Sequence, residues 1–147
     1  MKLYRYMSAQ EFNDLCIGMD MVNENPHKCC ATNSIGFCFL GEHTKEHYGD
    51  RVFSPTDCYD FLSGIVSPDV LVEFDAPDDA VSESYGAYAD PDDYDCDLFN
   101  IARIGITEYC TTHYSRDTFR PLRYCIPYHY RGAYPAEEAI WYNCNLV

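Results

Sequence analysis

Glu108 is the residue of this chain whose type and setting most strongly suggest chemistry. It stands in a strand-like run within residues 106–126, ITEYCTTHYSRDTFRPLRYCI, and is followed directly by Tyr109. A carboxylate at the edge of a buried strand loses hydration, so it is a costly choice unless it has a task. The alternative interpretation is an ordinary glutamate on the wet face of an antiparallel strand.

Arg5 is a second candidate, in the segment LYRYMS of residues 3–8. An arginine that projects from a first strand can fork onto a phosphate or a ribose hydroxyl. The alternative is a surface charge that pairs with the acidic bulk of the chain.

The segment SIGFCFLGEHTKEHYG, residues 34–49, is the third candidate. It combines a small polar residue, a glycine, an aromatic-rich strand and a later tyrosine: Ser34, Gly36, Phe37, Phe39 and Tyr48. Cys38 stands inside the aromatic strand, where we expect it to pack as a small hydrophobe.

The overall charge limits the partners that this chain could bind. A length of 147 residues predicts one domain, residues 1–147, with a core of its own. The formal net charge is −14, and no Lys or Arg occurs between Arg51 and Arg103. Wide nucleic-acid surfaces need clustered basic residues. A basic protein or a polar small molecule is therefore the better fit, and an anionic nucleotide would depend on Arg5 and the basic residues within 116–123.

The cysteines and the start of the chain favour a cytoplasmic protein without metal. The nine cysteines are odd in number, and the opening MKLYRYMSAQEF has no apolar signal region, so we expect free thiols. No run approaches the roughly 18–20 apolar residues of a membrane span. There is no C-x-x-C pair for zinc, and a calcium loop started at Asp93 would lack its Gly and Glu.

Periodicity and turn signals predict the elements that must position these groups. Ser8 and Glu11 form a capping box that starts a helix, and Gly18 ends it. A second helix is expected from Ser54-Pro55 to Gly64. Strands are expected at residues 2–6, 35–40, 69–75, 104–112 and 122–126, with an edge strand or short helix at residues 139–142. Many strands with few helices predict a compact, mostly antiparallel α+β domain.

Taken in order, the three segments resemble motifs of the ADP-ribosyltransferase superfamily, in its diphtheria-toxin and poly(ADP-ribose) polymerase branch. The resemblance covers most of residues 3–126. It implies a split-sheet fold, NAD as the substrate, and transfer of ADP-ribose to a macromolecular acceptor, more readily a protein than a nucleic acid. In that glycosyltransferase chemistry Glu108 would grip the ribose and stabilise an oxocarbenium-like transition state.

The resemblance also assigns a site. Catalytic roles fall to Arg5, Ser34 and Glu108. The role of Ser34 follows the arginine-first branch of the superfamily, whose Ser-Thr-Ser strand Thr32-Asn33-Ser34 partly matches. Arg5 and Glu108 are expected on neighbouring central strands that line one cleft with the strand of residues 34–39. NAD contacts fall to Arg5, Tyr6, Ser34, Gly36, Phe37, Phe39 and Tyr48. The chain departs from the family pattern at Tyr6, where many transferases have Gly, and at Cys38, where the toxin-like branch has a stacking Tyr. The alternative is therefore a non-catalytic ADP-ribosyltransferase-like module for binding or interaction.

Overall fold

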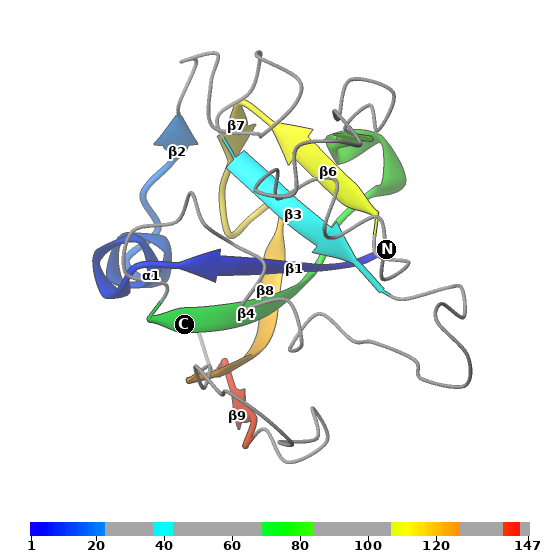
Figure 1. Cartoon of the computed structure of the whole chain (residues 1–147). Helices are drawn as coiled ribbons and strands as arrows, with labels where there is room; N and C mark the ends of the chain where they lie inside the picture. The colour runs from blue at the N-terminus through cyan, green and yellow to red at the C-terminus, as the bar shows by residue number, and fades with distance from the viewer. Residues whose placement is uncertain (23–36, 43–68, 84–106, 127–139, 145–147) are drawn as a thin grey trace, which may run out of the picture.

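A computed structural model describes residues 1–22, 37–42, 69–83, 107–126 and 140–144 of the chain (Figure 1). In chain order the elements are β1 (Lys2–Met7), α1 (Ala9–Cys16), β2 (Met21–Val22), β3 (Phe37–Gly41), β4 (Val70–Asp75), the 3-10 helix η2 (Asp78–Ala80), β5 (Ser82–Glu83), β6 (Glu108–Thr111), β7 (His113–Tyr114), β8 (Arg120–Cys125) and β9 (Tyr142–Asn143).

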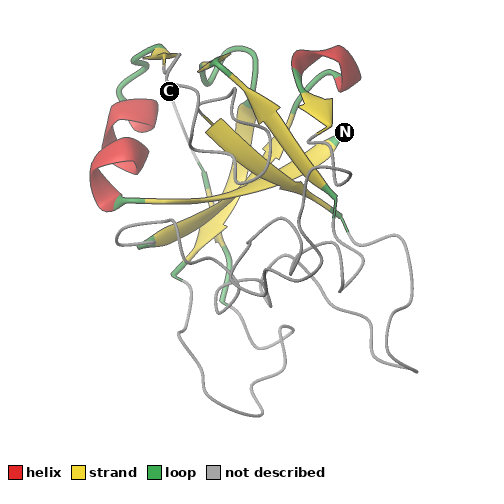
Figure 2. Cartoon of the chain, turned by 45° about the horizontal axis from the view of Figure 1, so that its top comes forward, coloured by secondary structure: helices red, strands yellow, loops and turns green. Residues whose placement is uncertain are grey.

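These strands form two antiparallel sheets. The larger has seven strands in the order β5-β6-β3-β1-β4-β8-β9, and the smaller pairs β2 with β7. Figure 2 shows α1 at the end of β1, beside the strands. The predicted mostly antiparallel α+β class is confirmed at this level, since the described part is an antiparallel sheet with one α-helix.

The sheet is buried on both faces at its centre, and the two faces are named here by their residues. The helix face carries the main apolar core, which α1 joins through Leu15: Leu3, Met7, Leu15, Phe37, Phe39, Val70, Val72, Phe74, Ala76, Tyr114 and Phe119. The far face carries the alternate positions of the same strands, which are also buried: Tyr4, Tyr6, Leu40, Leu71, Glu73, Cys110 and Cys125. Strand β4 therefore has no solvent-exposed face, because residues 70–74 are all buried.

The start and end of α1 follow the local signals in the sequence. The Oγ of Ser8 accepts a hydrogen bond from the backbone N–H of Glu11 at 3.1 Å, and Gly18 has a φ of +85°, which only glycine adopts without strain. The reciprocal half of the capping box is wrong. The carboxylate of Glu11 turns instead to Arg5 and Tyr114, because the buried guanidinium of Arg5 is the stronger partner.

Several predicted boundaries shift. Strand β6 begins at Glu108, and the predicted turn after it contains the short strand β7. Pro121 lies inside β8 beside a register shift between Glu73 and Phe74, where a residue without an N–H is tolerated. The tail ends in an edge strand, β9, which pairs with β8. The helix predicted for residues 54–64 lies outside the described residues.

We expect Phe39→Ala to lower the free energy of unfolding by about 3–5 kcal/mol, the usual cost of truncating a buried aromatic residue. Phe39 is fully buried, and its ring meets those of Phe74, Tyr114 and Phe119 at centroid distances of 5.7, 5.3 and 4.9 Å. Urea denaturation followed by circular dichroism measures the change. Ile140→Ala is the control because Ile140 is exposed, and equal effects of the two substitutions would contradict this core.

Candidate functional site

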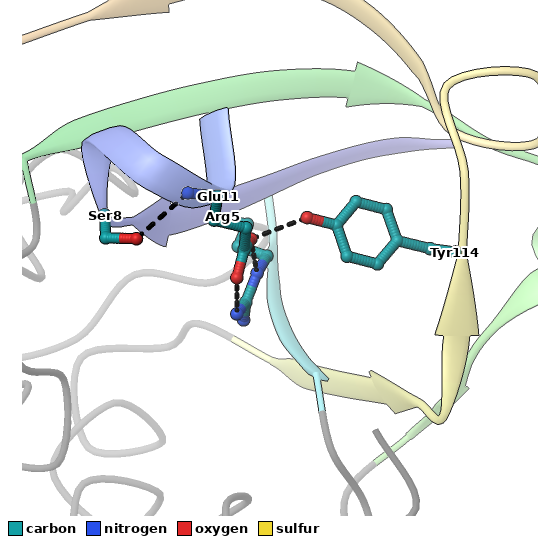
Figure 3. Close-up of polar contacts among 4 residues, drawn as sticks. All are labelled: Arg5, Ser8, Glu11 and Tyr114. Atoms are coloured by element: carbon teal, nitrogen blue, oxygen red, sulfur yellow. Dashed lines mark hydrogen bonds and ion pairs between the residues drawn. The ribbon is translucent and has the colours of Figure 1, made fainter. Parts of the chain in front are cut away.

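The candidate site on the helix face is a closed cluster of Arg5, Glu11 and Tyr114 (Figure 3). Arg5 donates from Nε to Oε2 of Glu11 at 2.7 Å and from Nη2 to Oε1 at 2.8 Å. The hydroxyl of Tyr114 donates to Oε2 of Glu11 at 2.6 Å. This is a two-point arginine–carboxylate pair with a third donor, and it joins β1, α1 and β7.

Burial strengthens the electrostatic interaction among these three side chains. The side chains of Arg5 and Glu11 are only 13% and 16% exposed. Burial opposes ionisation of Glu11, but the charge and hydrogen bonds of Arg5 outweigh it and hold the pKa of Glu11 below its usual value. Burial also opposes the charge on Arg5, yet Glu11 raises the pKa of Arg5 above its usual range. Burial raises the pKa of Tyr114, so its hydroxyl stays protonated and donates.

The aromatic strand β3 supports Arg5 from one side. The guanidinium carbon of Arg5 lies 5.1 Å from the ring centroid of Phe37 and 5.7 Å from that of Phe39. These are cation–π distances. Arg5 and the two phenylalanines are thus brought together as the sequence predicted. They form one packed unit in which Glu11 occupies the fork of the guanidinium that was expected to face NAD.

Glu108 does not lie on a strand next to that of Arg5, so the expectation of neighbouring strands is wrong. Strand β3 lies between β1 and β6. In the strand register Glu108 is opposite Leu40, and Leu40 is opposite Tyr4, whereas Arg5 is opposite Val72. Directly opposed residues share a face and successive residues alternate. By this register the backbone positions 5 and 108 alternate in the pleat, on two strands that β3 separates.

The remaining predicted site residues divide into three groups. Phe37 and Phe39 are buried in the core of the helix face. Tyr6 is buried opposite Leu71 on the far face, away from Arg5. Ser34, Gly36 and Tyr48 lie outside the described residues. The backbone of Cys38 pairs with Cys110 in the middle of the sheet.

A second polar cluster, which the sequence reasoning missed, lies on the far face and is called here the far-face cluster: Tyr4, Glu73, Arg123 and Trp141. Oε2 of Glu73 accepts from the hydroxyl of Tyr4 at 2.8 Å and from Nη2 of Arg123 at 2.9 Å. The guanidinium of Arg123 stacks on Trp141 at 4.3 Å from the ring centroid. The available signal was a glutamate inside the apolar run of β4, because a buried carboxylate needs partners.

Three of the described cysteines are poor candidates for an activated nucleophile. Cys16, Cys125 and Cys144 are free thiols. Burial raises the pKa of Cys125 to about 12, and burial together with the nearby Cys16 thiol raises that of Cys144 to about 11. Thiols with raised pKa values are poor nucleophiles at neutral pH.

A metal cluster and a membrane-spanning helix are both absent from the described residues. Among them, no three His, Cys, Asp or Glu side chains converge so that they could hold a metal ion. Within the described ranges, no helix has the length and apolar character that crossing a membrane requires.

Comparison with known proteins does not add to the geometry. No protein-family model, no curated protein and no solved structure matches this chain. The candidate site therefore rests on the residues and their contacts.

We expect Glu11→Gln to lower the free energy of unfolding by roughly 3 kcal/mol, the lower end for removing one partner of a buried ion pair. Gln keeps the size of Glu11 but removes the negative charge that pairs with Arg5. The lowered pKa of Glu11 stabilises the fold above about pH 4.5, its ordinary value, and this contribution is lost as the pH falls through the folded pKa. The difference between the two proteins should therefore shrink in acid.

Urea titrations at neutral and acidic pH measure both effects. Gln10→Ala is the control in the same helix, since Gln10 is exposed, and it should change stability by about 0.5 kcal/mol or less. A loss of stability in Glu11→Gln that does not depend on pH would contradict the assigned ion pair.

Proposed function

We propose that this protein is a non-catalytic module for binding and interaction, of ADP-ribosyltransferase-like architecture, and that its partner is a basic protein. The observation that carries the proposal is the closed pair of Arg5 and Glu11. A transferase would need this guanidinium for NAD, and here Glu11 already accepts from its Nε and Nη2 at 2.7 and 2.8 Å.

Two other features support a module without catalysis. Strand β3 separates β1, which carries Arg5, from β6, which begins with Glu108. The position expected to hold an aromatic ring for stacking on nicotinamide is Cys38, and a thiol cannot stack. An NAD-dependent reaction would have to obtain three things elsewhere: a guanidinium for NAD, adjacent strands for Arg5 and Glu108, and an aromatic ring that stacks on nicotinamide.

Charge supports a basic partner. The chain has a formal net charge of −14. Exposed carboxylates gather between the end of β4 and β5, at Asp75, Asp78, Asp79 and Glu83. The terminal amine of Met1 approaches Asp75 and Asp78 at 3.6 and 3.4 Å, but Asp78 remains 90% exposed. A segment rich in Lys and Arg would be steered to this surface by its charge.

An active mono-ADP-ribosyltransferase is the second candidate function. The observation that favours it is the direct pairing of β6, which begins with Glu108, with the aromatic strand β3. The resemblance implies that the Glu108 strand and the aromatic strand contribute to one site, with NAD as substrate and a macromolecule as acceptor.

Incubation with NAD labelled in its nicotinamide separates the two candidates. We expect no nicotinamide release above buffer by the wild type, by Glu108→Gln or by Glu83→Gln. Glu83 is the matched control because it is an exposed carboxylate on the neighbouring strand β5. Release by the wild type and by Glu83→Gln, reduced about 10²–10³-fold in Glu108→Gln, would establish the transferase instead, since that is the usual loss for one electrostatic contact in a transition state.

Binding of charged peptides tests the partner class. We expect a fluorescent Lys-rich peptide to bind with an affinity that falls as salt rises, and a Glu-rich peptide of equal length to show no binding, because attraction between exposed charges is screened by salt. Replacing Asp78 and Asp79 by Asn should lower the affinity for the Lys-rich peptide. Asn13→Ala on α1 should leave that affinity unchanged. Fluorescence anisotropy measures both, and equal binding of the two peptides would overturn the basic partner.

A further inference from the structure

We infer that the far-face cluster of Tyr4, Glu73, Arg123 and Trp141 is a binding site for a small neutral ligand with adjacent hydroxyls, such as a sugar. This goes beyond the proposed function, because it concerns a different ligand on the face opposite Arg5. It holds whichever way the NAD experiment falls.

The first step is the state of the Glu73 carboxylate. Glu73 is 3% exposed and lies in the middle of β4. Both of its hydrogen bonds, from Tyr4 and from Arg123, end on Oε2. No donor among the described residues bonds to Oε1. A buried acceptor without a donor costs about 1–3 kcal/mol, so Oε1 calls for a hydrogen-bond donor.

The second step is the donor beside it. The side chain of Arg123 is 39% exposed, in contrast to Glu73, so this side of the cluster is accessible from outside. A guanidinium carries five N–H donors, and Arg123 therefore retains donors beyond its Nη2 bond to Glu73. The acceptor Oε1 and these donors belong to two side chains that are joined at 2.9 Å, so they lie within one ligand's reach. Two adjacent hydroxyls, each able to donate and accept, match that pair.

The third step is the aromatic wall. Trp141 meets the ring of Tyr4 edge-on, with centroids 6.4 Å apart and planes at 63°, and it carries the guanidinium of Arg123 on its face. Aromatic side chains with a few fixed polar groups are the usual lining of small-molecule sites. The C–H surface of a sugar ring can pack on such side chains while its hydroxyls reach the polar groups.

The fourth step is charge. Glu73 and Arg123 form an ion pair at 2.9 Å, so the two charges offset each other. Burial, followed by the nearby Glu73, raises the pKa of Tyr4, and its hydroxyl stays a neutral donor. A cluster with no excess charge favours a neutral polyhydroxyl ligand over a phosphate or a nucleotide.

The experiment uses the full chain and its single tryptophan. Trp141 is the only tryptophan of the sequence, so fluorescence excited selectively from tryptophan, at wavelengths that tyrosine does not absorb, reports on this site. Glucose, galactose, mannose and ribose are titrated as free sugars, and the same protein is applied to an array of immobilised glycans. Binding of free sugars points to a metabolite, and binding to glycans alone points to a glycan chain. Either one, if saturable, supports the site.

Variants connect any such binding to the named residues. Glu73→Gln should lower the affinity for the sugar about tenfold or more, which is the value of one hydrogen bond to a charged group. Arg123→Lys, at a partly exposed position, guards against misfolding of the first variant and should weaken binding similarly, because Lys lacks the planar fork. Tyr142→Phe is the control, since Tyr142 stacks on Tyr124 on the helix face. No saturable signal with any sugar or glycan, or unchanged binding in both variants, would overturn the inference and leave the cluster as an ion pair within the fold.

Discussion

The structure depends on the neutralisation of two buried charges on opposite faces of adjacent strands. Arg5 of β1 faces the helix side, and Glu73 of β4 faces the other. Removing either group from water costs several kcal/mol, which only a well-placed counter-ion and hydrogen bonds return. Glu11 supplies these for Arg5, and Arg123 supplies them for Glu73. The elements that carry the two counter-ions, α1 and β8, are thereby held at defined places beside the central strands.

Each neutralised charge also connects segments that are distant in sequence. Tyr114 reaches Glu11 across 103 residues, and Tyr4 reaches Glu73 across 69. Replacing such a pair with apolar residues often leaves stability unchanged or improves it. The contribution we assign to both clusters is therefore one of specificity, since a strand out of register would leave a charge buried without its partner. The apolar core supplies the bulk of the stability.

Local signals explain which parts of the fold could be predicted. The cap at Ser8, the glycine that ends α1, and the apolar patterns of β1 and β4 lie within a few residues of what they determine. The order of strands has no such local signal, so the insertion of β3 between β1 and β6 was missed. Glu11 was read as a capping residue because nothing local in the sequence shows that Arg5 and Tyr114 both bind its carboxylate. A two-residue strand such as β7 is too short to show a period.

The same alternation that builds the core keeps Arg5 and Glu108 apart. Placing both positions on one face would require a slip of one residue between β1 and β3 or between β3 and β6. Because side chains alternate with a period of two, a slip in which β3 turns over would move Phe37 and Phe39 out of the core of the helix face. Each large apolar side chain removed from a core loses about 1.5–3 kcal/mol of burial. Arg5 would at the same time lose the two rings it lies over. The aromatic residues that made β3 resemble an NAD-binding strand are thus the residues whose burial fixes the register of β3 against β1.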